Sequence, residues 1–158
     1  MKIFLLRHAP AVYGGPDPDR PLTESGKRMA AQLAAFTRAR RYYSYTEIWC
    51  SPYLRARQTA EPFAVNGKKP IPVKWMDSLT PHGEPADLLP RLARLNHPVL
   101  IVGHNPHLSI LAHYLLGAAE AHFPFKKGAL WVFKKDPLSP SGYSLSACLP
   151  PASLGLKG

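Results

Sequence analysis

Two stretches of the sequence, Lys2-Ile3-Phe4-Leu5-Leu6-Arg7-His8 and Pro98-Val99-Leu100-Ile101-Val102-Gly103-His104, share one pattern. In each of them an apolar run long enough for a strand leads directly into polar residues. Continuous apolar strands are typical of parallel sheets that are covered on both faces. In open sheets of this kind ligands bind beside the carboxyl ends of the strands. Two histidines at that edge, one of them next to an arginine, indicate a phosphate site.

The rest of the chain alternates between predicted helices and predicted strands. Thr23 can cap a helix that runs to about Arg41, and Ser51-Pro52 is a strong start signal for a second helix. The remaining predictions are strands at 45–50, 71–75, 129–134 and 143–148 and helices at about 85–95 and 107–116. This alternation predicts a three-layer α/β/α sandwich with a mostly parallel sheet. We expect one domain over residues 1–150 and a C-terminal tail over residues 151–158.

Composition narrows the class of protein. The 158 residues carry a formal net charge of +10, which favours anionic partners in general. The basic residues are spread along the chain without a recognisable nucleic-acid module, and the group at 38–41 fits a helix end, so we expect no nucleic-acid partner. No apolar run reaches the roughly 18 residues that span a bilayer, so we expect no membrane association.

Compartment and redox state follow from the N-terminus and the cysteines. The chain turns polar at Arg7, too early for a secretory signal, so we expect a cytoplasmic protein. Cys50 and Cys148 both lie in strand-like runs, and we expect them to be reduced thiols of the core. The seven histidines show no zinc-type spacing, and we expect neither a metal nor a cofactor.

The predicted topology brings three polar clusters to one sheet edge. Arg7 and Arg55 can each offer a bidentate fork to phosphate oxygens, and a helix beginning at Ser51 would add backbone N–H groups. An imidazole there can act as a nucleophile if a backbone carbonyl keeps its far nitrogen protonated. The second imidazole, if protonated, would donate to the phosphate oxygens. His8 and His104 are the two candidates.

Four ordered motifs carry a resemblance to a known family. They are Leu6-Arg7-His8-Ala9, Pro21-Leu22-Thr23-Glu24-Ser25-Gly26, Ser51-Pro52-Tyr53-Leu54-Arg55-Ala56-Arg57-Gln58-Thr59-Ala60 and Val102-Gly103-His104-Asn105-Pro106. Their order and spacing resemble the histidine phosphatase, or phosphoglycerate mutase-like, superfamily over roughly the first 117 residues. The short chain without a large insertion, together with Leu79-Thr80-Pro81-His82-Gly83, looks most like its SixA-type phosphohistidine phosphatases.

The resemblance implies a fold, an activity and residue roles. It implies a metal-independent phosphatase in which His8 is the nucleophile and passes through a phosphohistidine that water hydrolyses. Arg7, Arg55 and His104 would complete the phosphate pocket, and Pro21 to Gly26 would be scaffolding. The position after the nucleophile is often glycine in the family and is Ala9 here, which slightly limits the loop conformations.

The general acid is the main departure from the family pattern. Mutase-like members use a carboxylate to protonate an alkoxide leaving group, and Glu84 is the nearest candidate, with a helix-terminal charge as its alternative role. A leaving imidazole departs more easily than an alkoxide, which favours phosphohistidine in proteins as the substrate. A small-molecule phosphomonoesterase and a non-catalytic phosphate-binding module stay open as alternatives. The partner in each case is a phosphorylated protein or metabolite, and the sequence leaves the oligomeric state open. His82 and His107 lie near the predicted site edge, and we expect each to be a rim residue or a polar group at a helix start and not a catalyst.

Overall fold

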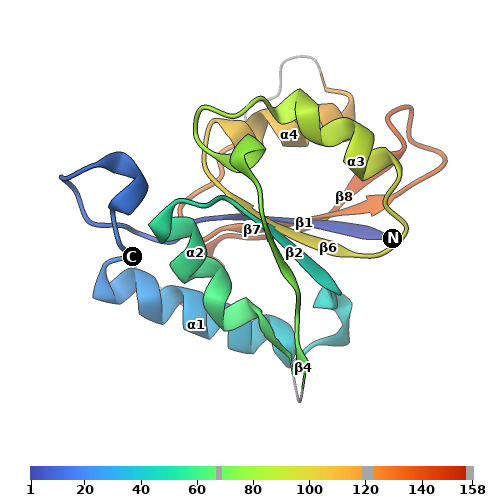
Figure 1. Cartoon of the computed structure of the whole chain (residues 1–158). Coiled ribbons are helices and arrows are strands. Elements are labelled where there is room, and N and C mark those ends of the chain that lie inside the picture. Colours follow the sequence, from blue (N-terminus) through green and yellow to red (C-terminus); the bar gives the residue numbers. More distant parts are fainter. Residues whose placement is uncertain (67–68, 119–122, 156–158) are drawn as a thin grey trace.

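A six-stranded sheet forms the middle layer of the computed structural model, which describes residues 1–66, 69–118 and 123–155 (Figure 1). The strand order is β5-β2-β6-β1-β7-β8. The strands are β1 (Lys2–Arg7), β2 (Glu47–Cys50), β5 (Val73–Trp75), β6 (Val99–Gly103), β7 (Leu130–Lys135) and β8 (Tyr143–Leu149). The pairs from β5 to β1 are parallel, whereas β7 runs antiparallel to both β1 and β8. The predicted mostly parallel sheet is therefore confirmed.

Helices cover both faces of this sheet. The helices α1 (Glu24–Arg38) and α2 (Leu54–Ala60) lie on one face, and α3 (Leu89–Ala93) and α4 (His107–Leu116) lie on the other (Figure 1). Thr23 caps α1 as predicted, because its hydroxyl accepts a hydrogen bond from the backbone N–H of Gly26 at 3.0 Å. Gly117 ends α4 in a left-handed conformation, which glycine adopts without strain. The three-layer prediction is thereby confirmed.

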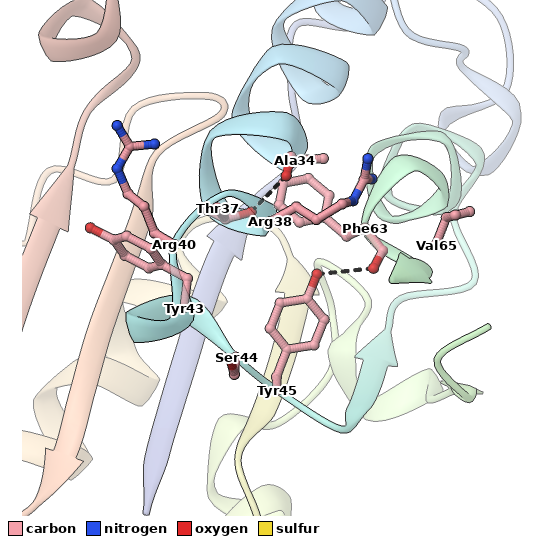
Figure 2. Close-up of a pocket in the computed structure, with 9 residues that line it drawn as sticks. All are labelled: Ala34, Thr37, Arg38, Arg40, Tyr43, Ser44, Tyr45, Phe63 and Val65. Carbon is pink, nitrogen blue, oxygen red and sulfur yellow. Dashed lines mark hydrogen bonds between the residues drawn. The ribbon is translucent and has the colours of Figure 1, made fainter. Parts of the chain in front are cut away.

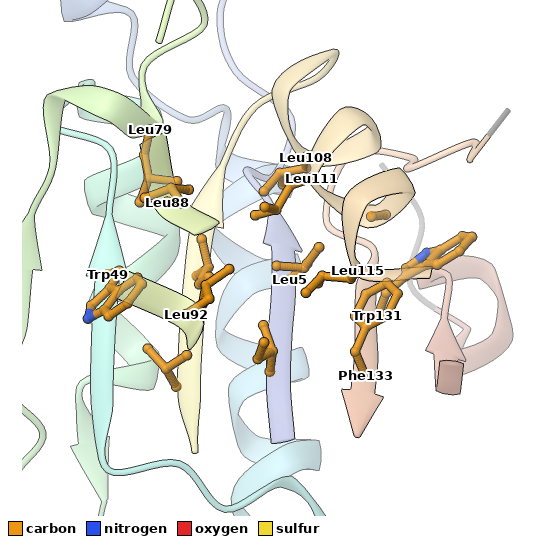
Figure 3. Close-up of a cluster of buried hydrophobic side chains, with 14 of the residues drawn as sticks. Leu5, Trp49, Leu79, Leu88, Leu92, Leu108, Leu111, Leu115, Trp131 and Phe133 are labelled. Carbon is orange, nitrogen blue, oxygen red and sulfur yellow. The ribbon is translucent and has the colours of Figure 1, made fainter. Parts of the chain in front are cut away.

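Side chains of the sheet alternate between two apolar cores. In β1, Ile3 and Leu5 join the cluster under α3 and α4, in which Figure 3 shows Leu5. Phe4 and Leu6 join the cluster under α1 and α2. All four side chains are fully buried. Burial of one such side chain stabilises a fold by about 1.5–3 kcal/mol, so β1 is held firmly from both sides. The end of β1, which carries the site, is fixed by this packing.

Two predicted helices differ from the structure at their boundaries. The helix expected to reach Arg41 ends at Arg38, and residues Arg41–Tyr43 form a separate 3-10 helix. The helix expected at 85–95 is a 3-10 helix, Pro85–Leu88, followed by the short α3. Pro90 explains the break, because proline lacks a backbone N–H and is accepted only in the first turn of an α-helix.

Further short elements complete the described chain. They are the hairpin of β3 (Val65–Asn66) and β4 (Lys69–Pro70) and the 3-10 helices Asp17–Asp19, Glu61–Phe63, Asp77–Leu79 and Pro151–Leu154. The last of these lies within the predicted tail, and its Pro151 is buried. Cys50 is buried as expected, but the expectation of a core position is wrong for Cys148, which is exposed on the edge strand β8. Among the described helices, none combines the length and the apolar character that a bilayer crossing needs.

A small hollow lies where β2 begins, at the edge of the sheet opposite to His8 (Figure 2). The hydroxyl of Thr37 donates to the Ala34 carbonyl, and the hydroxyl of Tyr45 donates to the Phe63 carbonyl at 2.9 Å. The cavity volume is about 30 Å³, where one water molecule needs about 10–15 Å³ on the same measure. This hollow has room for a few water molecules at most and is too small for a substrate.

Candidate functional site

Parallel pairing of β1 with β6 brings the two histidines together. Arg7 lies opposite Gly103 in the register, and the backbone N–H of His8 donates to the Gly103 carbonyl at 2.9 Å. The ring centroids of His8 and His104 are 5.1 Å apart. Both side chains are almost completely buried, with 6% and 2% exposure. The two polar clusters, Arg7-His8 and Gly103-His104, therefore lie side by side at the carboxyl edge of the sheet, as predicted from the sequence.

The imidazole of His8 is held as a neutral base. Its Nδ1 lies 2.7 Å from the carbonyl oxygen of Ala9, which can only accept, so Nδ1 carries the proton and Nε2 keeps its lone pair. Burial, together with the positive charges of Arg55 and Arg7, lowers the pKa of His8 to about 4 against the opposing effect of the Ala9 bond. At neutral pH the ring is therefore uncharged and has a nitrogen lone pair available for attack.

His104 is neutral as well, and Ser51 fixes its tautomer. The Nε2 atom of His104 lies 2.8 Å from the Ser51 hydroxyl, and that hydroxyl accepts the Tyr53 backbone N–H at 3.3 Å. Because one lone pair of the hydroxyl already accepts a hydrogen bond, we assign its proton to the bond with Nε2, which places the ring proton of His104 on Nδ1. Burial and the neighbouring charges of His8 and Arg55 lower the pKa of His104 to about 2. His104 was expected to donate to phosphate oxygens as a protonated imidazole, but at neutral pH the ring is uncharged. Any hydrogen bond that it donates to phosphate then comes from the N–H of the neutral ring.

The prediction that a helix begins at Ser51-Pro52 is wrong. The helix α2 begins at Leu54, after Tyr53 in an extended conformation with ψ of 136°. Ser51 is fully buried, and its hydroxyl lies within hydrogen-bond distance of His104. The expected contribution of a helix N-terminus at Ser51 to anion binding is therefore absent from the described chain, and Ser51 instead orients a histidine. This role is visible only from the contact with His104, which follows β6 and lies 53 residues further along the chain.

Two arginines flank the histidines in closely similar ways. Nη1 of Arg7 donates to the Phe125 carbonyl at 2.6 Å, and Nη1 of Arg55 donates to the Asp17 carbonyl at 2.6 Å. The Nε atoms of both arginines and Nδ1 of His104 are buried and have no hydrogen-bond partner among the described residues. Buried donors of this kind are costly unless a ligand satisfies them. Their charge and number suit a tetrahedral anion beside His8.

One face of α2 ties the site to the loop that follows β1. Thr59 accepts the Ala9 backbone N–H at 3.0 Å, and Gln58 accepts the Leu22 backbone N–H at 2.7 Å. Gly26 supports the same loop, because a Cβ atom there would collide with the Pro10 carbonyl. The predicted scaffolding role of the Pro21 to Gly26 motif agrees with these contacts. The loop thereby lies against α2 where Arg55 emerges.

The remaining candidates lie elsewhere around this edge. Glu84 is exposed and accepts the Ala86 backbone N–H at 3.2 Å, as a residue preceding a 3-10 helix does. Its charge raises the pKa of His107, which burial lowers overall. His82 is exposed, as expected at a rim, whereas His107 is only 1% exposed and is not a rim residue. His107 is the first residue of α4, which agrees with the other expectation for it, a polar group at a helix start. Its place at the start of α4, under the segment at Ser78, explains this burial.

Chemically, this arrangement can hold a tetrahedral anion against a neutral imidazole. Within the described residues, no group of three or more histidine, cysteine or acidic side chains is placed to hold a metal ion. The fold and the site define an α/β protein whose polar edge carries two histidines and two arginines from β1, α2 and the end of β6.

Comparisons with known proteins give the family. The model of the histidine phosphatase superfamily (branch 1) matches residues 3–80. An uncharacterized protein of Picosynechococcus is 31% identical over 138 residues, which cover 82% of each chain. This chain belongs to the histidine phosphatase superfamily, branch 1.

Solved structures extend the similarity over nearly the whole chain. The protein histidine phosphatase SixA complexed with tungstate superposes with a TM-score of 0.85 at 24% identity, over 98% of this chain and 99% of that chain. The putative phosphohistidine phosphatase SixA of Agrobacterium tumefaciens has a TM-score of 0.77 at 27% identity, over 95% and 97% of the two chains. The fold predicted from the four motifs is thus confirmed.

Proposed function

We propose that this chain is a phosphatase that works through a phosphohistidine on His8 and removes phosphate from phosphohistidine in proteins. One observation supports the reaction most strongly: a neutral imidazole with its lone pair on Nε2 lies beside buried donors on Arg7, Arg55 and His104. Such donors stabilise the charge of a phosphoryl group during transfer. The resemblance to SixA-type proteins supports the substrate.

The reaction has two steps. In the first, the Nε2 lone pair of His8 forms a bond to phosphorus while the bond between phosphorus and the substrate imidazole nitrogen breaks. That electron pair leaves with the imidazole, which takes a proton from solvent. In the second step water attacks phosphorus, the bond to Nε2 breaks, and phosphate is released together with a proton. Arg7 and Arg55 hold the oxygens in both steps, and the Nδ1 proton of His104 donates to one of them.

The experiment compares wild type with His8→Asn on a phosphohistidine-carrying protein and on a small aryl phosphate. We expect wild type to release phosphate from both and the variant to release none above background. His113→Asn is the matched control, because this histidine lies on α4 against Phe123 and outside the site. Wild type without phosphate release on either substrate, or His8→Asn with full activity, would refute the proposal.

Two further measurements distinguish the alternatives. Acid-labile, base-stable phosphate bound to His8 after reaction would exclude a passive phosphate-binding module. A small-molecule phosphomonoesterase needs an acid for its alkoxide, so Glu84→Gln would then slow alkyl phosphates far more than aryl phosphates. Equal slowing of both substrate types by Glu84→Gln, relative to wild type, would count against that alternative.

A further inference from the structure

Asp17 contacts the phosphate-site arginine from the loop that follows β1. Its backbone carbonyl accepts Nη1 of Arg55 at 2.6 Å, and its carboxylate oxygen Oδ2 accepts Nη2 at 3.2 Å. The Arg55 side chain is 4% exposed, whereas the Asp17 side chain is 45% exposed. A loop carboxylate therefore covers one edge of a buried guanidinium that lies among the residues of the site.

The geometry of the guanidinium group decides what this contact does. Arginine has five N–H bonds in a rigid plane, and the edge between Nη1 and Nη2 is distinct from the edge that contains Nε. Asp17 occupies the first edge, because both of its contacts are to the terminal nitrogens. Nε of Arg55 is buried and finds no partner within the described residues. The edge that contains Nε is thus left for an oxyanion.

Arg7 gives an internal comparison. It too is held by a terminal nitrogen, through the bond from Nη1 to the Phe125 carbonyl, and its Nε is likewise buried without a partner in the described chain. Within the described ranges, the anchor of Arg7 is a neutral carbonyl alone, whereas the anchor of Arg55 combines a carbonyl with a carboxylate. Both arginines thus donate from Nη1 to a backbone carbonyl, and Asp17 adds a negative charge to this contact at Arg55.

Asp17 is anionic at neutral pH, and a second arginine holds it in place. Partial burial raises the pKa of its carboxyl, but the hydrogen bonds and charges of Arg55 and Arg20 outweigh this and hold the pKa below its ordinary value. The second carboxylate oxygen, Oδ1, lies 2.5 Å from Nη2 of Arg20. Arg20 lies three residues further along the same loop, so the two ion pairs link this loop to α2 at Arg55.

We propose that Asp17 is a positioning residue, which holds the Nη1–Nη2 edge of Arg55 so that the Nε edge faces the phosphoryl group. The inference rests on the proposed phosphate site and adds a residue to it. Its rival is an autoinhibitory contact, in which the carboxylate competes with phosphate for Arg55. The two differ in sign: a positioning residue strengthens phosphate binding, whereas a competitor weakens it.

The test is Asp17→Asn, which keeps the backbone carbonyl and the size of the side chain but removes the charge. We expect inorganic phosphate to bind about tenfold more weakly by calorimetry, and kcat/KM on an aryl phosphate to fall by a similar factor, chiefly through a higher KM. Asp19→Asn is the matched control, since this exposed carboxylate in the same 3-10 helix makes no ion pair within the described residues. It should leave both quantities unchanged.

A double-mutant cycle shows whether Asp17 acts through Arg55. In an Arg55→Lys background, which lacks the planar fork, Asp17→Asn should change phosphate affinity less than twofold. An equal loss in both backgrounds, tighter phosphate binding by Asp17→Asn, or unchanged binding would each overturn the inference. Phosphate binding needs no turnover, so a wild type that binds phosphate but hydrolyses nothing would refute the proposed function alone. A wild type that binds no phosphate would overturn both.

Discussion

Removal of the Ser51 hydroxyl tests whether a neutral His104 donates from Nδ1. The variant Ser51→Ala deletes the group that lies 2.8 Å from Nε2 of His104 and that accepts the Tyr53 backbone N–H. Without it the ring is free to carry its proton on Nε2, where it points away from the proposed phosphate position. We therefore expect slower catalysis, because a growing share of the enzyme lacks one donor.

The size of the effect follows from the strength of one buried hydrogen bond. A bond between neutral groups contributes about 0.5–1.5 kcal/mol, which changes a tautomer ratio roughly two- to tenfold. Complete loss of one preorganised donor costs about 10²–10³ in kcat and sets the upper limit, which His104→Ala should approach. For Ser51→Ala we expect a smaller loss, of up to about tenfold in kcat, with a smaller change in KM.

Steady-state kinetics on an aryl phosphate, with His104 tautomers followed by nitrogen-15 NMR, provide the assay. Thr37→Val is the control, because it removes an equally buried hydroxyl that donates to the Ala34 carbonyl in α1, far from the histidines. It should lower stability by about 1 kcal/mol and leave kcat unchanged. Wild-type kcat in Ser51→Ala, or an unchanged Nδ1–H tautomer, would refute the role of Ser51.

Three further predictions concern titration and reactivity. His8 should titrate by NMR near pH 4, where an ordinary histidine titrates near pH 6.5; a midpoint above pH 6 would contradict its burial as a neutral base. The folded state takes up protons on His8 and His104 only at lower pH than the unfolded state does, so stability is complete above about pH 6.5 and falls as the pH drops towards 4. Urea unfolding at pH 7 and pH 4.5 should show this loss, and equal free energies of unfolding would contradict it. Maleimide should label Cys148 in the folded protein and Cys50 only after unfolding; equal labelling rates would argue against their different burial.

The positions of the two histidines could be predicted from the sequence, because each follows an apolar run that is typical of a buried strand. The apolar run before Arg7 and His8 predicts a strand that is buried on both faces of the sheet, because such a strand has room for few polar side chains. The polar residues that follow it are then expected at the edge of the sheet. Gly103 and His104 repeat the pattern, and parallel pairing of the two strands then brings both histidines together. These positions follow from the apolar pattern of the two strands and from the rule that the carboxyl ends of parallel strands lie at the same edge of a sheet.

The parts that the sequence could not predict depend on contacts between distant segments. Ser51-Pro52 has the local pattern of a helix start, yet the Ser51 hydroxyl lies within hydrogen-bond distance of His104 in the folded chain, and α2 begins three residues later. Asp17 is one of several polar residues in a loop rich in proline and glycine, and only the folded chain shows that it contacts Arg55. Burial of His107 likewise depends on how α4 packs under the segment at Ser78.

The protonation states of the two histidines bear on the leaving group. A neutral His104 has a single N–H, on Nδ1, and Ser51 directs that proton away from itself and towards the proposed phosphate position. His8 has its only proton bonded to the Ala9 carbonyl. Neither ring then has a second proton to give, and Glu84 bonds to the backbone of Ala86. An alkoxide leaves slowly without an acid, whereas an imidazole can take its proton from solvent. The pattern of hydrogen bonds in the site therefore favours a phosphorus–nitrogen bond over an alkyl ester as the bond to be cleaved.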